Sequence, residues 1–523
     1  MKNYIKLLMI SGGVLLSSCR EDVLEPYTPG QLTEDLAIRT STDLNNLMNS
    51  GYAILNSRSE QVNVSVFTDE VGIGFANGGQ GISDEYIFLM NPGAPLPSNM
   101  WAVNYFALAR INRVIKLADT VVPKNADDQK VIAGIKAQAL TMRAYAHLRL
   151  LAYFSPDMKN DGALAAVLAD KVFLPSENQN LRATNGQFYS LIHSDLDNAI
   201  ALFNANSTAF SNITANVWLA KGLKARAYAY KGDYANALTF ANDVIANSGL
   251  SLANPAQYRQ VFFSDNQPSN VEVIFKFRRT PIQNAQDYNL HNGWASVRPT
   301  INGSPFYEVS RSLHNLLNPT NASAATLSTT NPDVRANVII APSSVIDPNY
   351  LNSSDVRNTD RIVINKHGGT TTGANSWAVT AANANHNDIK VMRLSEMYLI
   401  RAEASVASNL AGAAANIKSI RDARFGSSQP LPVYATAQQA WADILTERRI
   451  ELAYEGHRFI DVKRLGALAN MGLDRHPADY SSGTANYPGA NPTNMPLNSY
   501  KWALPIPQVE LNVNGAIQQN TGY

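Results

Sequence analysis

The sequence predicts a mainly α-helical protein in which a scaffold of long helical hairpins carries a loop-rich insert with short strands. Two observations support this fold class. Apolar residues recur with helical spacing over most of the first half of the chain and again after residue 390. Between residues 250 and 389 this spacing gives way to short strand-like runs among loops rich in Asn, Ser, Pro and Gly.

The first 18 residues have the pattern of a secretory signal peptide. Lys2 and Lys6 precede an apolar run, Leu7–Leu16, which ends in Ser17-Ser18 before Cys19. The run is too short to cross a bilayer, which takes about 20 helical residues. Cys19 is the one cysteine of the chain and occupies the position that a lipobox modifies. We therefore predict lipidation at Cys19, the alternative being an unmodified cysteine inside a signal that is cut elsewhere.

Residues 19–40 are predicted to be a lipidated leader. Arg20, Glu21 and Asp22 follow Cys19 and resemble the export signal of surface-exposed bacterial lipoproteins, although a charged tether would look the same. Residues 41–523 are predicted to form one body, because no linker rich in Pro, Ser or charge divides them. We expect its helical scaffold at about 41–249 and 390–465, the insert at about 250–389 and an extended C-terminal segment at 466–523.

Composition limits the classes of partner. The net charge is +1 and charged residues make up 16% of the chain, so there is no basic footprint for nucleic acid. The loops are instead rich in neutral polar residues, which suit a neutral polar ligand but are also simply solvated.

The helical segments include hairpins with a distinctive pattern. Small and aromatic residues alternate from Ala225 to Ala237 across a turn at Gly232-Asp233, which looks like a tetratricopeptide unit. A second hairpin is predicted from Met397 to Arg424, followed by a partner helix at 437–454. Further helices are predicted at 101–118, 129–154, 185–203, 215–231 and 234–248. Strands are predicted at 271–277 and 361–365, and the alternation in the first of them predicts that it is half-buried.

Several separated segments together resemble one family, the SusD/RagB nutrient-binding outer-membrane lipoproteins. Besides the lipobox, they are Trp101-x-x-x-Tyr105 with Arg110-Ile111-Asn112, Arg143-Ala144-Tyr145 with Tyr153-Phe154, 393-RLSEMYLIRAEA-404, 447-ERRIELAYEGHRFIDVKR-464, and the ending Leu504-Pro505-Ile506-Pro507 with Glu510 and Asn520. The resemblance implies a SusD-like, tetratricopeptide-like scaffold. It also implies a protein anchored in the outer membrane and exposed at the cell surface, which passes an oligosaccharide or another neutral polar nutrient to a SusC-like TonB-dependent transporter.

Three carboxylates in the longest of these segments deserve a separate interpretation. Glu447, Glu451 and Glu455 lie on one helical face and could suggest acid/base chemistry, but glycoside hydrolysis needs two carboxyl groups facing each other across a cleft. We favour a structural charge network. The basic residues predicted to neutralise them are Arg448, Arg449 and Arg458.

No motif of an enzyme, metal site or cofactor site is found in the sequence. It contains no His-Glu-x-x-His, no Walker loop, no Gly-x-Ser-x-Gly and no cysteine cluster. We expect a binding protein without enzymatic activity, metal or cofactor. The alternatives are a tetratricopeptide-type adaptor or peptide-capture protein and, less favoured, a secreted glycoside hydrolase.

A sugar site combines aromatic faces with polar side chains that bind hydroxyl groups. Trp101 is a candidate for such an aromatic face, but it could instead have a structural role in which it packs on Tyr105. The loop tryptophans Trp294 and Trp377 are also candidates, but they could instead be buried within their loops. Trp218, Trp441 and Trp502 are assigned to the core. The candidate ligand-binding residues are Trp101, Asn104, Asp69 with Glu70, Tyr288, Trp294, Tyr307 and Trp377.

Overall fold

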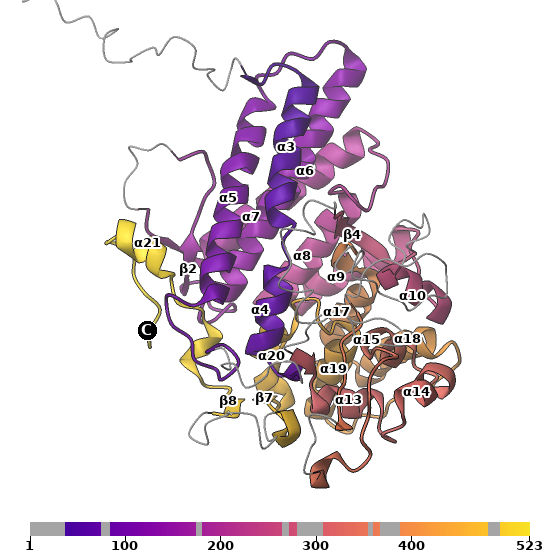
Figure 1. Ribbon diagram of the computed structural model, residues 1–523. Coiled ribbons are helices and arrows are strands. Elements are labelled where there is room, and N and C mark those ends of the chain that lie inside the picture. The colour runs from indigo at the N-terminus through magenta and orange to yellow at the C-terminus, as the bar shows by residue number, and fades with distance from the viewer. Residues whose placement is uncertain are drawn as a thin grey trace, which may run out of the picture.

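The computed structural model describes residues 37–74, 84–173, 180–263, 271–279, 307–353, 359–366, 387–479 and 492–523. Within these ranges the chain is mainly helical, with four antiparallel sheets of two strands each (Figure 1). The predicted fold class is confirmed. No helix among the described residues is long and apolar enough to span a membrane.

Long helices from the first half of the chain lie side by side in a bundle (Figure 1). Helix α3 (Ser41–Leu55) packs on α5 (Pro95–Leu117), α5 on α6 (Ala126–Phe154), and α6 on α7 (Asn185–Ala205). Helix α4 (Ser59–Phe67) follows α3 and also packs on α5. Because α6 has neighbours on several sides, its second half is buried all round rather than along one stripe.

The predicted hairpin at Gly232 is present as α8 (Val217–Lys231) and α9 (Tyr234–Asn247). The side chain of Asn216 caps the start of α8. Gly232 ends α8 with φ +83°, a left-handed conformation that glycine adopts without penalty, and Asp233 then caps α9. Local residues therefore determine this turn.

The second hairpin consists of α17 (Leu394–Ser405) and α18 (Leu410–Phe425). Helix α17 also packs against α9, so the two hairpins stack as tetratricopeptide units do. Helix α19 (Ala437–Glu451) contacts both α17 and α18 and then packs on α20 (Arg458–Ala469). The predicted helices agree with these elements apart from differences at their ends.

The insert contains more helix than the sequence predicted. Its described residues include four short helices, of which three have six or seven residues, too few for a helical period to be recognised. They are α10 (Pro255–Phe263), α13 (Arg311–Leu317), α14 (Ala324–Thr330) and α15 (Val334–Ile339).

The predicted strand at 271–277 is present as β4 (Val273–Phe277), but it is buried on both faces instead of half-buried. Lys276, on the face expected to be polar, is buried because its charge is neutralised there by Asp388, whose carboxylate lies 2.8 Å from Lys276 Nζ. At 361–365 there are isolated bridges rather than a strand. The antiparallel pairs are β1 (Val71–Ile73) with β5 (Tyr307–Val309), β2 (Leu164–Val167) with β3 (Arg182–Thr184), β4 with β6 (Ile389–Arg393), and β7 (Leu473–Asp474) with β8 (Asn494–Met495).

The C-terminal segment returns to the first bundle. Its helix α21 (Gln508–Val513) lies near β2 and the N-terminal part of α5 (Figure 1). Trp502 and Trp441 are buried as predicted, whereas Trp218 is only partly buried, with Lys221 Nζ 4.6 Å from the centre of its ring. Turns of 3-10 helix occur at Tyr350–Asn352, Pro477–Asp479 and Tyr500–Trp502.

Candidate ligand-binding site

Several of the predicted site residues lie outside the described residues. These are Cys19, Tyr288, Trp294 and Trp377, whose roles stay predictions. Tyr307 is described: it begins β5, is partly exposed, and its ring stacks on Tyr86 with 5.9 Å between the ring centres. The predicted residues are therefore not brought together into one site by the part of the chain that the structure describes.

Asp69 is a buried structural residue in this fold. Its carboxylate accepts hydrogen bonds from Arg458 Nε at 2.7 Å and Nη2 at 2.8 Å, and Arg449 lies 3.4 Å away. Burial alone would raise the pKa of Asp69, but Arg449 and Arg458 outweigh it and hold the pKa well below its ordinary value. Glu70 is buried too and accepts from the backbone N–H of Tyr454 at 2.9 Å. Neither carboxylate is presented to solvent.

Asn104 also has a structural role. It is buried, its Nδ2 donates to the carbonyl of Met100 at 2.6 Å, and its Oδ1 accepts from Arg149 Nη1 at 3.1 Å. The prediction that Asn104 and Asp69 contact a ligand did not take into account that Arg149 binds Asn104 and Arg458 binds Asp69. Arg149 and Arg458 are distant in the sequence, so spacing along the chain does not reveal them.

Trp101 lies in the N-terminal part of α5 and is 5% exposed. Its ring packs on Tyr105, with 4.7 Å between ring centres, and on Phe154, with 5.0 Å. Its indole N–H donates to Glu510 Oε2 of α21 at 3.3 Å. Trp101 thus has the structural packing considered as the alternative, and one edge of it also lines an open groove.

This groove runs between α5, β2 and α21 and has a volume of about 450 Å³. Pockets for small ligands typically measure about 300 to 1,000 Å³ and combine apolar walls with a few polar groups. The size and lining of this groove suit a sugar ring. Its lining residues are Trp101, Ala102, Tyr105, Phe106, Val167, Phe173, Asn180, Val509, Glu510, Val513 and Asn514.

Most of these lining residues were missed by the sequence analysis. One signal was available: Tyr105 and Phe106 are adjacent on a helix, where successive side chains point about 100° apart, so the pair covers a wide arc that can extend beyond the buried stripe. The pairing of α5 with α21 had no such signal, because Trp101 and Glu510 are 409 positions apart.

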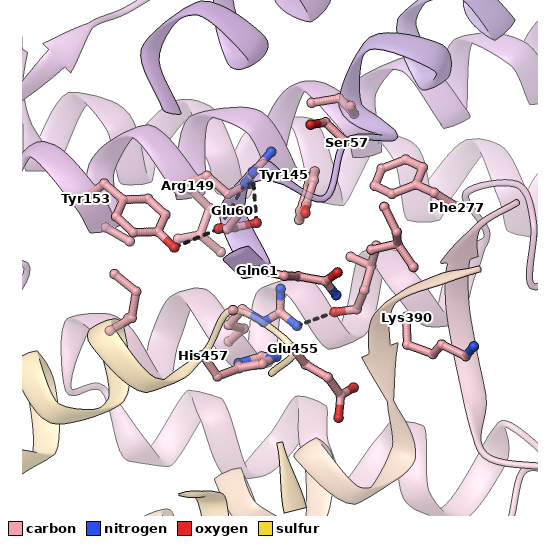
Figure 2. A pocket seen from close by; sticks show the side chains of 18 of the residues that line it. Ser57, Glu60, Gln61, Tyr145, Arg149, Tyr153, Phe277, Lys390, Glu455 and His457 are labelled. Atoms are coloured by element: carbon pink, nitrogen blue, oxygen red, sulfur yellow. Dashed lines mark hydrogen bonds and ion pairs between the residues drawn. The ribbon is translucent and has the colours of Figure 1, made fainter. Parts of the chain in front are cut away.

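A second hollow is a narrow polar cavity between α4, α6 and the turn before α20 (Figure 2). Glu60 accepts hydrogen bonds there from Arg149 Nη2 and Tyr153 Oη, both at 2.8 Å. Its volume of about 60 Å³ has room for a few water molecules, each of which takes about 30 Å³ in the liquid. A sugar does not fit, and the buried Gln61 Oε1, which has no protein partner in the described residues, is suited to a water instead.

Glu451 lies at the centre of a buried ionic network. Its side chain is 0% exposed, and Oε1 accepts hydrogen bonds from Arg393 Nη1 and Arg424 Nη2, both at 2.7 Å. Burial would raise the pKa of Glu451, but Arg424 and Arg393 outweigh it and hold the pKa well below its ordinary value. The carboxylate is therefore ionised and fully engaged.

The other two carboxylates of this helical face belong to the same network. Glu455 accepts from Lys366 Nζ at 2.8 Å, and Glu447 accepts from Arg421 Nε at 2.8 Å and pairs with Arg335. None of the three faces a partner carboxyl group across a cleft, which hydrolysis of a glycosidic bond requires. The prediction of a structural charge network is confirmed.

The prediction that Arg448, Arg449 and Arg458 neutralise these three carboxylates was wrong. Arg448 pairs with Asp461 at 2.8 Å, and Arg449 and Arg458 pair with Asp69. Neighbouring positions on a helix do not face each other, so the arginines next to Glu447 in the sequence point towards other elements. The network is closed by residues from the insert and from β6 and α18.

Two family models match the sequence. One, described as the SusD family, matches residues 336–523, and the other, described as starch-binding and associating with the outer membrane, matches residues 26–229. Among proteins with curated descriptions none matches.

Solved structures similar to this fold include a SusD superfamily protein from Bacteroides thetaiotaomicron, at 22% identity and a TM-score of 0.71, covering 92% of this chain and 99% of that one. A laminarin-binding SusD-like protein is 22% identical with a TM-score of 0.64 and coverages of 93% and 100%. Surface glycan-binding protein A from Bacteroides fluxus is 19% identical with a TM-score of 0.66 and coverages of 93% and 100%. These likenesses show the fold, and the two family models show that residues 336–523 are similar to the SusD family and residues 26–229 to a starch-binding family associated with the outer membrane.

Proposed function

We propose that the protein captures a glycan at the bacterial cell surface and passes it to a TonB-dependent transporter in the outer membrane. The observation that carries this proposal is the match of residues 26–229 to a family model described as starch-binding and associated with the outer membrane. The names of two structural relatives, a laminarin-binding protein and a surface glycan-binding protein, point to the same class of ligand.

The chemistry of the described residues fits binding better than catalysis. The three carboxylates on one helical face are held in ion pairs with arginine and lysine side chains. An ionised carboxylate held in this way cannot act as the protonated general acid that glycoside hydrolysis needs. The groove along α5 instead offers aromatic and aliphatic side chains beside a few polar ones, which is how sugar rings are commonly held.

Lipidation at Cys19 belongs to this proposal, because it would keep the binding body next to the transporter. A single acyl chain gives only marginal membrane binding, whereas two or more hold a protein firmly. The transporter partner rests on the family resemblance alone.

Two measurements test the proposal. Isothermal titration of the soluble form, beginning after Arg20, with starch and laminarin should give saturable binding, while unrelated peptides should give none. Purification of the full-length protein from detergent-solubilised outer membranes should recover a TonB-dependent transporter with it. Binding of peptides without glycans would favour the adaptor or peptide-capture alternative.

A further inference from the structure

The groove between α5, β2 and α21 has a second feature that its size does not explain, namely hydrogen-bond acceptors with unused capacity beside exposed rings. Phe106 is 62% exposed on one wall, and Tyr105 and Phe173 beside it are partly exposed. Val513, 79% exposed, stands on α21. Exposed large apolar residues occur singly on any surface, but these line one groove together.

Glu510 is one of the two acceptors. Its Oε2 accepts from the indole N–H of Trp101 at 3.3 Å, and its Oε1 accepts from Asn514 Nδ2 at 2.9 Å. A carboxylate has about four lone-pair positions for hydrogen bonds. These two contacts occupy half of them and also fix the side chain at the groove.

Asn514 is the other acceptor. It is only 6% exposed, and its Nδ2 donates to the backbone carbonyl of Asn180 at 2.8 Å as well as to Glu510. These two donated bonds identify the other amide atom as Oδ1, which has no hydrogen-bond partner among the described residues. A buried acceptor without a donor carries a desolvation cost. A hydroxyl group or an ordered water supplied with a ligand would remove that cost.

The lining also excludes whole classes of ligand. Among the described residues no lysine, arginine or histidine lines the groove, so none of them neutralises a uronic acid, a phosphate or a sulfate. The polar lining residues are the acceptor Glu510 and the amides of Asn180 and Asn514, so a ligand that fits them is uncharged and supplies hydrogen-bond donors to Glu510. Hydroxyl groups around a ring with apolar C–H faces meet both conditions, because the faces pack on aromatic side chains.

We propose that this groove is a binding site for one ring of an uncharged glycan. The ring packs against Phe106 and Tyr105, and its hydroxyl groups donate to Glu510 and, directly or through a water, to Asn514. This site is proposed in addition to the predicted loop tryptophans Trp294 and Trp377. It rests on the proposed glycan-binding function. It adds to that function the place where the glycan binds and the inference that the glycan is uncharged.

Affinity electrophoresis in gels containing soluble starch or laminarin tests the site. The variants are Phe106→Ala, which removes the exposed ring, and Glu510→Gln, which keeps an acceptor for Trp101 but removes the charge. Phe210→Ala is the matched control, because Phe210 is also an exposed phenylalanine, 46% exposed, and does not line the groove. Thermal unfolding of each variant establishes that it is folded.

For the polysaccharide that retards the wild type, Phe106→Ala and Glu510→Gln should each raise the dissociation constant roughly 3- to 10-fold, the size expected for one ring contact or one charged hydrogen bond near solvent. Phe210→Ala should leave it unchanged. Unchanged affinity in both groove variants, with the wild type still retarded, would overturn the groove site but not glycan binding. If neither polysaccharide retards the wild type, glycan binding itself and the groove site fail together.

Discussion

Replacing Glu451 by Gln tests whether the ionic network has the structural role that its geometry indicates. The substitution keeps the size of the side chain and removes one negative charge at a position that is 0% exposed. Arg393 and Arg424 then each lose a charged acceptor at 2.7 Å. Both arginines stay buried: Arg424 keeps Glu272 as its charged partner, and Arg393 keeps Glu272 and Glu455.

Removing one partner of a buried ion pair typically costs about 3 to 5 kcal/mol, because the opposite charge is left without compensation. For a body of roughly 500 residues, the unfolding entropy of about 2.1 cal/mol/K per residue amounts to about 1 kcal/mol/K. The expected decrease in Tm is therefore about 3 to 5 °C for two-state unfolding.

Differential scanning calorimetry of the soluble form measures this decrease. Asp127→Asn is the control, because the side chain of Asp127 is 90% exposed and its pair with Lys130 lies on the surface. The control should unfold within about 1 °C of the wild type. A Tm for Glu451→Gln within the same range would refute the reasoning, since the network would then contribute no more than a surface pair.

Three further predictions concern a buried acid, the anchor and the insert. Burial raises the pKa of Glu70 from 4.5 to about 7, so the folded protein holds a proton that the unfolded chain has lost, and stability falls as pH rises between these values. Glu70→Gln should raise Tm at pH 8, and the Tm of this variant should depend less on pH between these two values than the Tm of the wild type. Thermal scans at pH 5 and pH 8 in which the variant matches the wild type would contradict this. Cys19→Ala should move the protein out of the membrane fraction, and its retention there would show that something other than a lipid at this residue holds the protein at the membrane. Trp294→Ala or Trp377→Ala should lower glycan affinity in a titration without changing Tm, whereas a lower Tm with unchanged affinity would assign these rings to the core.

The helical scaffold could be predicted because its signals are local. The turn at Gly232 needs one residue with a positive φ, and the apolar spacing of α8 and α9 extends over several turns on either side of it. The short helices of the insert could not be predicted in this way. A helix such as Val334–Ile339 is less than two turns long, so it shows no periodicity to recognise.

The candidate site depended on contacts between segments that are far apart in the sequence. Asp69 was expected at a binding surface, but Arg458, 389 positions away, makes its burial possible. Trp101 was predicted as a candidate ligand-binding residue, and it lines a groove together with Glu510, which comes from the other end of the chain. Residue type indicated which side chains could bind a sugar, while only the folded chain shows which of them lie together.

We propose that this SusD-like protein binds glycans and does not cleave them. One experiment tests it most directly: incubation of the soluble wild-type protein with starch and with laminarin, with bound polysaccharide and released reducing sugar measured in the same samples. We predict that one of the two is bound and that no reducing sugar is released. Release of reducing sugar above the level of a protein-free sample, or binding of neither polysaccharide, would contradict the account.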